Sequence, residues 1–131
     1  MKILLDTQAW LWMIGPHDRL SKSARAVLKD AQNELYLSTA AVWEIGIKHA
    51  AGKLKFTGPL TVHIPMHIRR SGVRPLPPTV EHVLRAAALP MHHRDPFDRM
   101  MVAQAQEDEL ALLTTDARLG AYEVEIIPAA G

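Results

Sequence analysis

Short aliphatic runs alternate with longer segments whose apolar residues recur at helical spacing along this 131-residue chain. The runs are apolar at consecutive positions, which is typical of strands covered by helices on both faces of a sheet. This pattern predicts strands at 2–5, 34–37, 73–76, 110–113 and 124–127. Because Pro75 has no amide hydrogen for a sheet ladder, the third of these is predicted to be an edge strand.

The intervening segments place apolar residues three and four positions apart, which predicts amphipathic helices. These are expected at 7–14, 20–31, 40–51, 60–70, 79–89 and 95–106, with a turn or short helix at 117–120. Pro65 interrupts a helix unless it begins one, so the fourth helix is expected to be short. Because helix and strand alternate without a linker or repeat, we predict a single α/β domain over residues 1–131. Its sheet of four to five strands should be mostly parallel, with helices on both faces.

Composition narrows the classes of function. Apolar residues make up 48% of the chain and charged residues 22%, with a formal net charge of +1, as in ordinary globular proteins. Binding to nucleic acid would therefore need a local basic patch. The absence of cysteine excludes disulfides and thiolate metal sites and fits a reducing compartment. The run 2–5 is too short for a signal peptide, and no run approaches the roughly 20 residues of a membrane span. We therefore expect a cytoplasmic protein that does not cross a membrane.

Acidic and hydroxyl residues follow three of the predicted strands. The first strand is followed by Asp6 and Thr7, the second by a Ser-Thr pair, and the fourth by Thr115 and Asp116. Each acid taken alone could simply cap the next helix. However, the carboxyl ends of parallel strands meet at one edge of a sheet, where ligands bind in such folds. We therefore expect these side chains to gather at that edge.

Two further acids, Glu44 and Asp98, fall in predicted helices among apolar neighbours. Glu44 lies one turn into a helix that is apolar nearly all round, with no partner for a capping box. On a helical wheel Asp98 lies in an apolar arc, with Arg99 and Gln106 on the opposite, wetter side. Carboxylates in apolar settings need a proton or a cation to compensate them. Together the acids indicate a hard divalent ion, Mg²⁺ or Mn²⁺ rather than zinc, of the kind used in phosphodiester chemistry.

Histidine offers a competing metal site that the spacing disfavours. His92 and His93 are adjacent, so their rings cannot share one helix face, and Pro65 separates His63 from His67. We interpret these histidines mostly as surface residues or local helix caps. The chain has no glycine-rich phosphate loop, nucleophile elbow or dinucleotide fingerprint. Nucleoside-triphosphate, acyl-transfer and dinucleotide chemistry are therefore disfavoured.

Four motifs together resemble a PIN domain, and more closely the VapC-type toxin of a bacterial or archaeal type II toxin–antitoxin pair. They are Lys2-Ile3-Leu4-Leu5-Asp6-Thr7, Ser38-Thr39 followed by Glu44, Asp95-Pro96-Phe97-Asp98-Arg99, and Leu113-Thr114-Thr115-Asp116. The resemblance covers essentially the whole chain, and the Asp-Pro-Phe-Asp-Arg motif is its most specific part. It implies a PIN-like α/β/α sandwich and an Mg²⁺- or Mn²⁺-dependent endoribonuclease that a cognate antitoxin inhibits. It also implies a homodimer.

The resemblance further implies roles for individual residues. The catalytic quartet would be Asp6, Glu44, Asp98 and Asp116. Asp6 and Asp98 would be the principal metal ligands, and the other two acids would complete the site directly or through water. A metal-bound water would then attack the RNA phosphate in line.

Supporting residues lie beside these motifs. Thr7, Asp95 and Thr115 would orient ligands or water. For Asp95, which precedes a proline, the interpretation as a helix start is favoured. The segment 53–78 matches no motif and is a candidate for substrate or antitoxin specificity.

Three arginines flank the acids: Arg94, Arg99 and Arg118. They are either solvated surface residues or contacts for RNA phosphates beside a site that otherwise repels them. For Arg118 the solvated interpretation is favoured.

Two other functions are alternatives. The near-neutral charge and the two tryptophans of the segment 7–14 are compatible with a catalytically inert PIN-like module that binds RNA or protein. A response-regulator-like phosphoacceptor also gathers acids at strand ends, but Asp6 has no acidic neighbour and no lysine directly follows the segment 110–113. The sequence leaves open which RNA is cut and how many metal ions bind.

Overall fold

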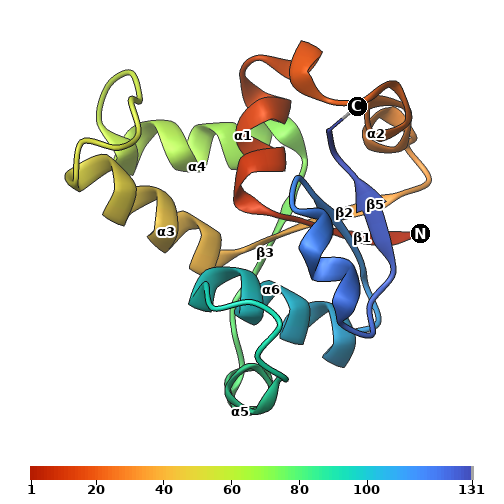
Figure 1. Cartoon of the computed structure of the whole chain (residues 1–131). Coiled ribbons are helices and arrows are strands. Elements are labelled where there is room, and N and C mark those ends of the chain that lie inside the picture. Colours follow the sequence, from red (N-terminus) through yellow and green to blue (C-terminus); the bar gives the residue numbers. More distant parts are fainter. Residues whose placement is uncertain (131) are drawn as a thin grey trace.

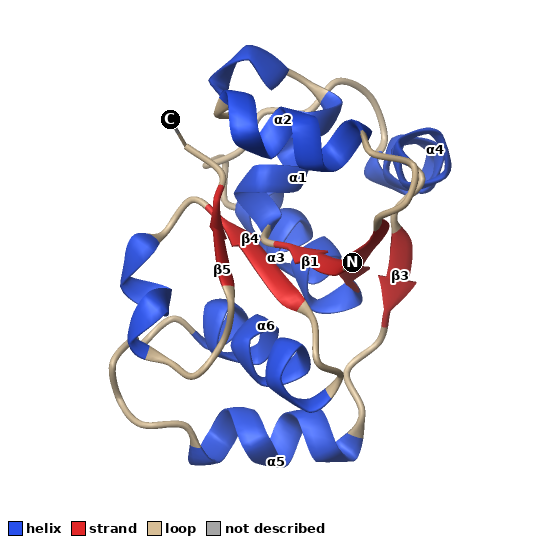
Figure 2. Ribbon diagram, turned by 90° about the vertical axis from the view of Figure 1, so that its right-hand side faces the viewer, coloured by secondary structure: helices blue, strands red, loops and turns tan. Residues whose placement is uncertain are grey.

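Five short strands form one sheet at the centre of the molecule (Figure 2). In the computed structural model, which describes residues 1–130, they are β1 (Lys2–Leu5), β2 (Glu34–Ser38), β3 (Arg74–Leu76), β4 (Ala111–Thr114) and β5 (Ile126–Pro128). All neighbouring pairs are parallel, in the order β3-β2-β1-β4-β5. The predicted α/β class with a parallel sheet of four to five strands is confirmed, and β3 is an edge strand as Pro75 predicted. Gly131, where the predicted domain ends, lies outside the described residues.

Helical segments connect the strands (Figure 1). They are α1 (Thr7–Ile14), η1 (His17–Arg19), α2 (Lys22–Lys29), α3 (Thr39–Ala50), α4 (Leu60–Ser71), α5 (Val80–Ala88), α6 (Pro96–Glu107) and η2 (Ala117–Ala121). In Figure 2, α1, α2 and α4 lie on one side of the sheet, and α6 lies on the other with α5 beyond it. The fold is therefore the α/β/α sandwich that the resemblance implied.

The sheet separates two hydrophobic cores. Along β1, Ile3 and Leu5 pack into the core that includes residues of α1, α2 and α3, and Leu4 packs into the other. The second core contains Met101 and Val102 of α6. All three β1 side chains are fully buried. Burying an aliphatic side chain of this size stabilises a fold by about 2 kcal/mol. The aliphatic run at the start of the chain is therefore well suited to the central strand.

Strand β1 also fixes where the chain can place a ligand site. The chain moves outward from β1 to β2 and β3, then crosses back to form β4 on the other side of β1. Leu5 lies in register with Leu37 of β2 and Leu113 of β4. Asp6 therefore emerges where the strand order reverses, which is where open parallel sheets bind ligands.

Helix α4 runs through Pro65, which the sequence analysis expected to interrupt it. A proline lacks the amide that would bond to the carbonyl of Thr61, four residues earlier. Both residues are exposed, so water can satisfy that carbonyl. Ile64 is buried in the first core and holds the helix in place. A proline at an exposed position of a well-anchored helix is therefore tolerated.

Further observations concern the start of α2 and the burial of the two tryptophans of α1. The helix expected at 20–31 begins only at Lys22, because Ser21 caps it by accepting the Ala24 amide at 3.0 Å. Trp10 is fully buried. Trp12 is half-buried and lines a groove described below. Within residues 1–130, no helix combines the length and the apolar character needed to cross a membrane.

Candidate functional site

Asp6 follows β1 and accepts hydrogen bonds from two directions. Its Oδ1 accepts the Ala9 amide at 2.7 Å, which caps α1. Its Oδ2 accepts the Thr114 hydroxyl at 2.7 Å and the Thr115 amide at 2.9 Å, both at the end of β4. The residue is 4% exposed. Burial raises the pKa of Asp6 despite these donors, so its charged form gains from a nearby cation.

Glu44 extends from α3 and contacts the first residue of α1. Its Oε1 accepts the Thr7 hydroxyl at 2.6 Å, and its Oε2 accepts Lys48 Nζ at 2.6 Å. Glu44 is buried, whereas the Lys48 side chain is half exposed. The hydrogen bond to Glu44 raises the pKa of Lys48, which therefore stays protonated. Lys48 is not among the residues predicted for the site, although a lysine four residues after a glutamate is a recognisable helical pair.

Asp98 lies in the first turn of α6, after the cap residue Asp95. Asp95 Oδ1 accepts the amides of Phe97 and Asp98, at 2.8 and 3.3 Å. The carboxylate of Asp98 itself accepts no hydrogen bond from residues 1–130, and His93 Nε2 lies 3.5 Å from its Oδ2. Burial, followed by repulsion from Asp95, raises the pKa of Asp98 to about 7. The charges of Asp6 and Glu44 contribute to this rise in the pKa, and that of His93 opposes it.

Asp116, after β4, has the opposite surroundings. Arg118 donates to both of its carboxylate oxygens, from Nε to Oδ1 at 2.9 Å and from Nη2 to Oδ2 at 2.7 Å. His93 Nε2 also lies 2.9 Å from Oδ2. The Arg118 hydrogen bonds, and after them that of His93, hold the pKa of Asp116 well below its ordinary range. The Asp116 oxygens are therefore already paired.

All four acids line one cavity of about 360 Å³. The three residues predicted to support them also line it: Thr7, Asp95 and Thr115. The remaining lining residues come from α1, α3 and the segment after α3: Gln8, Leu11, Ile45, Lys48, Lys53 and Leu54. The structure therefore brings together every acid and every supporting residue that the sequence singled out.

Arg99 is not on the wetter side of α6, where the helical wheel placed it. It is 8% exposed and donates to four backbone carbonyls, at 2.9 to 3.2 Å: Ala86, Leu89, Pro90 and His93. The wheel assumes one buried face, but α6 packs against both the sheet and α5. The end of α5 leaves carbonyls without helical donors, and Arg99 satisfies them. Its guanidinium is therefore buried in the fold and not a solvated surface group.

The other two arginines differ from Arg99. Arg118 lies beside the cavity on Asp116, with its side chain 75% exposed. Arg94 is exposed and does not line the cavity.

The interpretation of the adjacent histidines is wrong for one of them. His92 is exposed, but the side chain of His93 is 8% exposed and lies against Asp98 and Asp116. Its Nδ1 accepts the amide of Asp95, the residue that caps α6. A histidine two residues before a helix cap is the one sequence signal that points to this placement.

The carboxylates fit a hard divalent cation. Asp98 offers oxygens without donors, and Asp6 Oδ1 accepts a single hydrogen bond although it has two lone pairs. Neutral groups would not relieve the repulsion that raises the pKa of Asp98, whereas a divalent cation would. A site whose ligand atoms are all oxygens suits Mg²⁺ or Mn²⁺.

A basic groove adjoins the acidic cavity and encloses about 870 Å³. The two share four lining residues: Gln8, Leu11, Lys53 and Leu54. The basic groove is further lined by cationic or imidazole side chains and by two aromatic rings: Arg19, Lys55, His63, His67, Trp12 and Phe56. None of its lining residues is acidic. Positive and negative surfaces therefore meet at Lys53.

The likeness to known proteins agrees with this geometry. Ribonuclease VapC16 of Mycobacterium tuberculosis is 39% identical over 70 residues, which make up 50% of this chain and 48% of that protein. The match thus spans about half the length of this curated relative. The structure of VapBC2 from Rickettsia felis bound to a promoter DNA fragment superposes with a TM-score of 0.72 at 13% identity, over 98% of this chain and 99% of that one.

A second solved structure, DNA-bound VapBC from Salmonella typhimurium, gives a TM-score of 0.70 at 15% identity, over 98% of both chains. At these identities the structural likeness concerns the fold. The sequence model of the PIN domain matches residues 3–125, nearly the whole chain. The chain therefore belongs to the PIN-domain family.

Proposed function

We propose that this protein is a metal-dependent endoribonuclease that acts as the toxin of a toxin–antitoxin pair. The observation that carries the proposal is the cavity at the reversal of strand order, where Asp6, Glu44 and Asp98 gather and the Asp98 carboxylate has no donor. Support comes from a relative named as a ribonuclease.

The cofactor that we propose is Mg²⁺ or Mn²⁺, held mainly by Asp6 and Asp98. Glu44 and Asp116 would complete the site directly or through water. Such an ion, when bound, lowers the pKa of a water nucleophile and stabilises charge on the phosphoryl group. Because Asp98 holds a proton more readily than an ordinary carboxyl, loading the site at neutral pH releases that proton.

The chain's own residues keep the carboxylates in place for this chemistry. The Thr7 hydroxyl fixes Glu44, and the Thr115 amide fixes Asp6. Asp95 begins α6 at the point that makes Asp98 face the cavity. These hydrogen bonds mean that little rearrangement is needed when a cation and a substrate bind.

We further propose that the RNA strand enters along the basic groove. Lys53 and Lys55 provide exposed charges for phosphates, and the half-buried Phe56 and Trp12 provide rings on which bases can stack. Phe56 packs edge-on against His67, with ring centroids 5.9 Å apart, which fixes the groove wall to α4. The predicted specificity segment 53–78 supplies this wall. Of the predicted arginines, we retain Arg94 and Arg118 as RNA contacts.

The proposed partners are a cognate antitoxin and a second copy of the chain, in the cytoplasm. The solved relatives named above are VapBC complexes, which supports the antitoxin. For the homodimer, α5 exposes Val80, Val83 and Leu84 at i, i+3 and i+4 spacing, and α3 exposes Trp43, whose side chain also contacts Phe97. Sedimentation of the wild type and of a Leu84→Glu variant tests this face.

Cleavage of a structured RNA by purified protein tests the function. We expect cleavage with Mg²⁺ or Mn²⁺, none with EDTA, and a loss of at least about 100-fold in Asp6→Asn and Asp98→Asn. Asp30→Asn, which changes an exposed acid outside the cavity, is the matched control. RNA binding without any metal-dependent cleavage would favour the inert PIN-like module instead.

RNA binding along the basic groove is tested separately, in an Asp98→Asn background that binds without cutting. Lys53→Glu with Lys55→Glu should weaken binding about tenfold or more and reduce its salt dependence. Lys22→Glu, an exposed lysine on α2, is the control. If the double variant binds RNA normally but loses the antitoxin, the groove serves the protein partner and not the substrate.

A further inference from the structure

His93, in the loop between α5 and α6, lies against the acids but has no role in the chemistry proposed above. Its Nε2 lies 2.9 Å from Asp116 Oδ2 and 3.5 Å from Asp98 Oδ2. Within residues 1–130, these three side chains bring possible ligand atoms within 4.8 Å of one another, as in a metal site. Whether the ring can bind a metal depends on which of its nitrogens carries the proton.

The second ring nitrogen identifies the tautomer. The Asp95 amide donates to His93 Nδ1 at 3.1 Å. A nitrogen that accepts a hydrogen bond carries no proton, so the proton of the ring is on Nε2. Nε2 therefore donates to Asp116 and has no lone pair to offer a metal. If the ring proton were on Nδ1, that N–H would point at the Asp95 amide N–H, and two donors would face each other. The Asp95 amide is held in this place because Asp95 is the N-cap of α6.

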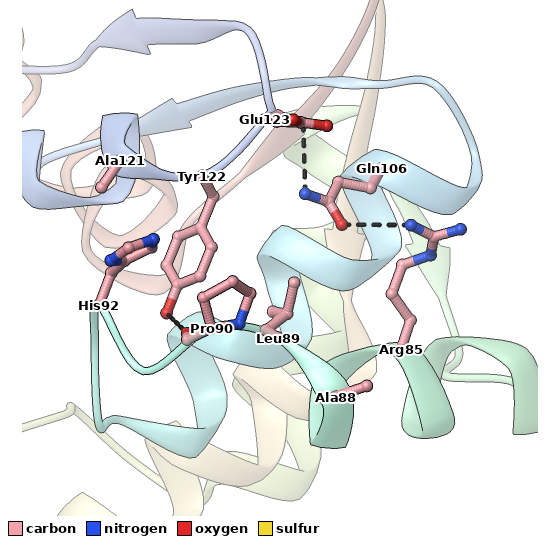
Figure 3. A pocket seen from close by; sticks show the side chains of 9 residues that line it. All are labelled: Arg85, Ala88, Leu89, Pro90, His92, Gln106, Ala121, Tyr122 and Glu123. Carbon is pink, nitrogen blue, oxygen red and sulfur yellow. Dashed lines mark hydrogen bonds between the residues drawn. The ribbon is translucent and has the colours of Figure 1, made fainter.

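The loop that carries His93 is held in place from the side away from the cavity. The Tyr122 hydroxyl donates to the Pro90 carbonyl at 2.8 Å and accepts the His93 amide at 3.0 Å. Figure 3 shows the Tyr122 ring reaching Pro90, with His92 beside it. Arg99 donates to the carbonyls of Pro90 and His93, at 3.0 and 3.2 Å. His93 is therefore a preorganised donor.

The Asp116 carboxylate needs such a donor at Oδ2, because the backbone fixes only Oδ1, which accepts the Arg118 amide at 3.0 Å. Arg118, two residues later, binds both carboxylate oxygens, but its side chain is 75% exposed. A long side chain in water does not fix a carboxylate well. The His93 side chain, whose Nε2 lies 2.9 Å from Asp116 Oδ2, is only 8% exposed.

We propose, on the basis of the proposed metal-dependent function, that His93 is a positioning residue. It is a neutral Nε2–H donor that holds the Asp116 carboxylate beside Asp98, and it is not itself a metal ligand. The hydrogen bonds thus form a chain from the Asp95 amide through the His93 ring to the Asp116 carboxylate. Metal binding remains with the carboxylates.

Nitrogen-15 NMR of the histidine rings tests the tautomer in the wild-type protein, without any assay of activity. We expect His93 to carry its proton on Nε2 in the metal-free protein and to keep it there at saturating Mg²⁺. A proton on Nδ1, or loss of the Nε2 proton when Mg²⁺ binds, would overturn the proposal. This result is independent of whether the protein cleaves RNA.

Calorimetric titration with Mg²⁺ tests the positioning role. His93→Gln keeps a donor near the place of Nε2, whereas His93→Asn keeps only an acceptor near the place of Nδ1. Second-sphere partners of a metal site typically contribute about tenfold or more to affinity. We therefore expect His93→Asn and His93→Ala to weaken Mg²⁺ binding by about tenfold and His93→Gln to stay within about threefold of the wild type.

His92→Ala is the matched control, because that ring is exposed and packs on Tyr122 with centroids 5.1 Å apart. It should bind Mg²⁺ like the wild type. Equal affinities in His93→Asn, His93→Gln and the wild type would overturn the positioning role. If the substitutions prevent folding, the wild-type NMR measurement still decides between donor and ligand.

Discussion

Two neighbouring residues of α6, Asp98 and Arg99, carry buried charges that the protein treats in opposite ways. The Asp98 carboxylate accepts no hydrogen bond from the described residues, lies among other acids, and has its pKa raised to about 7. The Arg99 guanidinium donates to four backbone carbonyls and lies 3.4 Å from the Tyr122 hydroxyl. One charge is left uncompensated and the other is fully paired, although one peptide bond separates them.

The comparison shows that the Asp98 charge is suited to binding a ligand, whereas the Arg99 charge is suited to stabilising the fold. A paired buried charge stabilises the fold only while all its partners are present, and removing one partner leaves polar groups buried without a partner. An uncompensated carboxylate destabilises the metal-free fold, and this strain is relieved when a cation binds. In the proposed function the cavity side of α6 serves ligand binding, whereas its other side holds the loop before the helix.

Loss of the Arg99 charge should give the largest change in stability. Arg99→Met keeps much of the apolar stem but removes a donor from four carbonyls, of which that of Pro90 still accepts the Tyr122 hydroxyl and the His92 amide. We expect it to lower the free energy of unfolding by about 3 kcal/mol or more. Urea unfolding measures this. Arg94→Met, an exposed arginine five residues earlier, should change the free energy by less than about 0.5 kcal/mol. Equal stabilities of the two variants would contradict the structural role.

The next largest effect should be the change in Mg²⁺ affinity with pH. The folded pKa of Asp98 is about 7, against an ordinary value of 3.8, so between these values the metal-free fold holds a proton that the cation must displace. Mg²⁺ affinity should therefore fall by up to about tenfold for each unit of pH below 7 and level off above it. The raised pKa of Asp6 acts in the same direction. Calorimetry in buffers of different ionisation enthalpy should show proton release, and Asp98→Asn should flatten the profile.

The same raised pKa predicts that Asp98→Asn stabilises the metal-free protein. A carboxyl whose folded pKa is raised contributes stability below its unfolded pKa and loses it as the pH rises through the folded value. At a pH above about 7, removing the charge should therefore raise the free energy of unfolding by about 1–2 kcal/mol, after allowance for partial exposure. Asp116→Asn should not stabilise the protein, because the charge of Asp116 is paired. Thermal unfolding in EDTA compares the two, and stabilisation of both variants or of neither would contradict the distinction.

The acids of the site could be predicted from the sequence because the features that mark them lie next to them in the chain. The strands that precede Asp6 and Asp116 and the apolar helix around Glu44 are visible in the order of residues, and parallel topology brings their ends together. Arg99 and His93 could not be placed in this way. Arg99 donates to backbone carbonyls at the end of α5 and in the loop after it, and His93 joins a backbone amide of that loop to the distant Asp116 carboxylate. Neither helical spacing nor composition records where these groups point.

Substitution of Arg118 should give the smallest effects. It separates the influence of Arg118 on metal affinity from its influence on RNA affinity. It pairs with Asp116 and so competes with any cation for those oxygens, but an exposed pair of this kind is worth little. Arg118→Ala should raise Mg²⁺ affinity by no more than about two- to threefold while His93 still holds Asp116. If Arg118 also contacts phosphate, RNA affinity in the Asp98→Asn background should fall by a similar factor, about two- to fivefold. Parallel titrations with Mg²⁺ and with RNA distinguish these effects, because a purely solvated arginine would change neither and an essential metal-site residue would weaken Mg²⁺ binding.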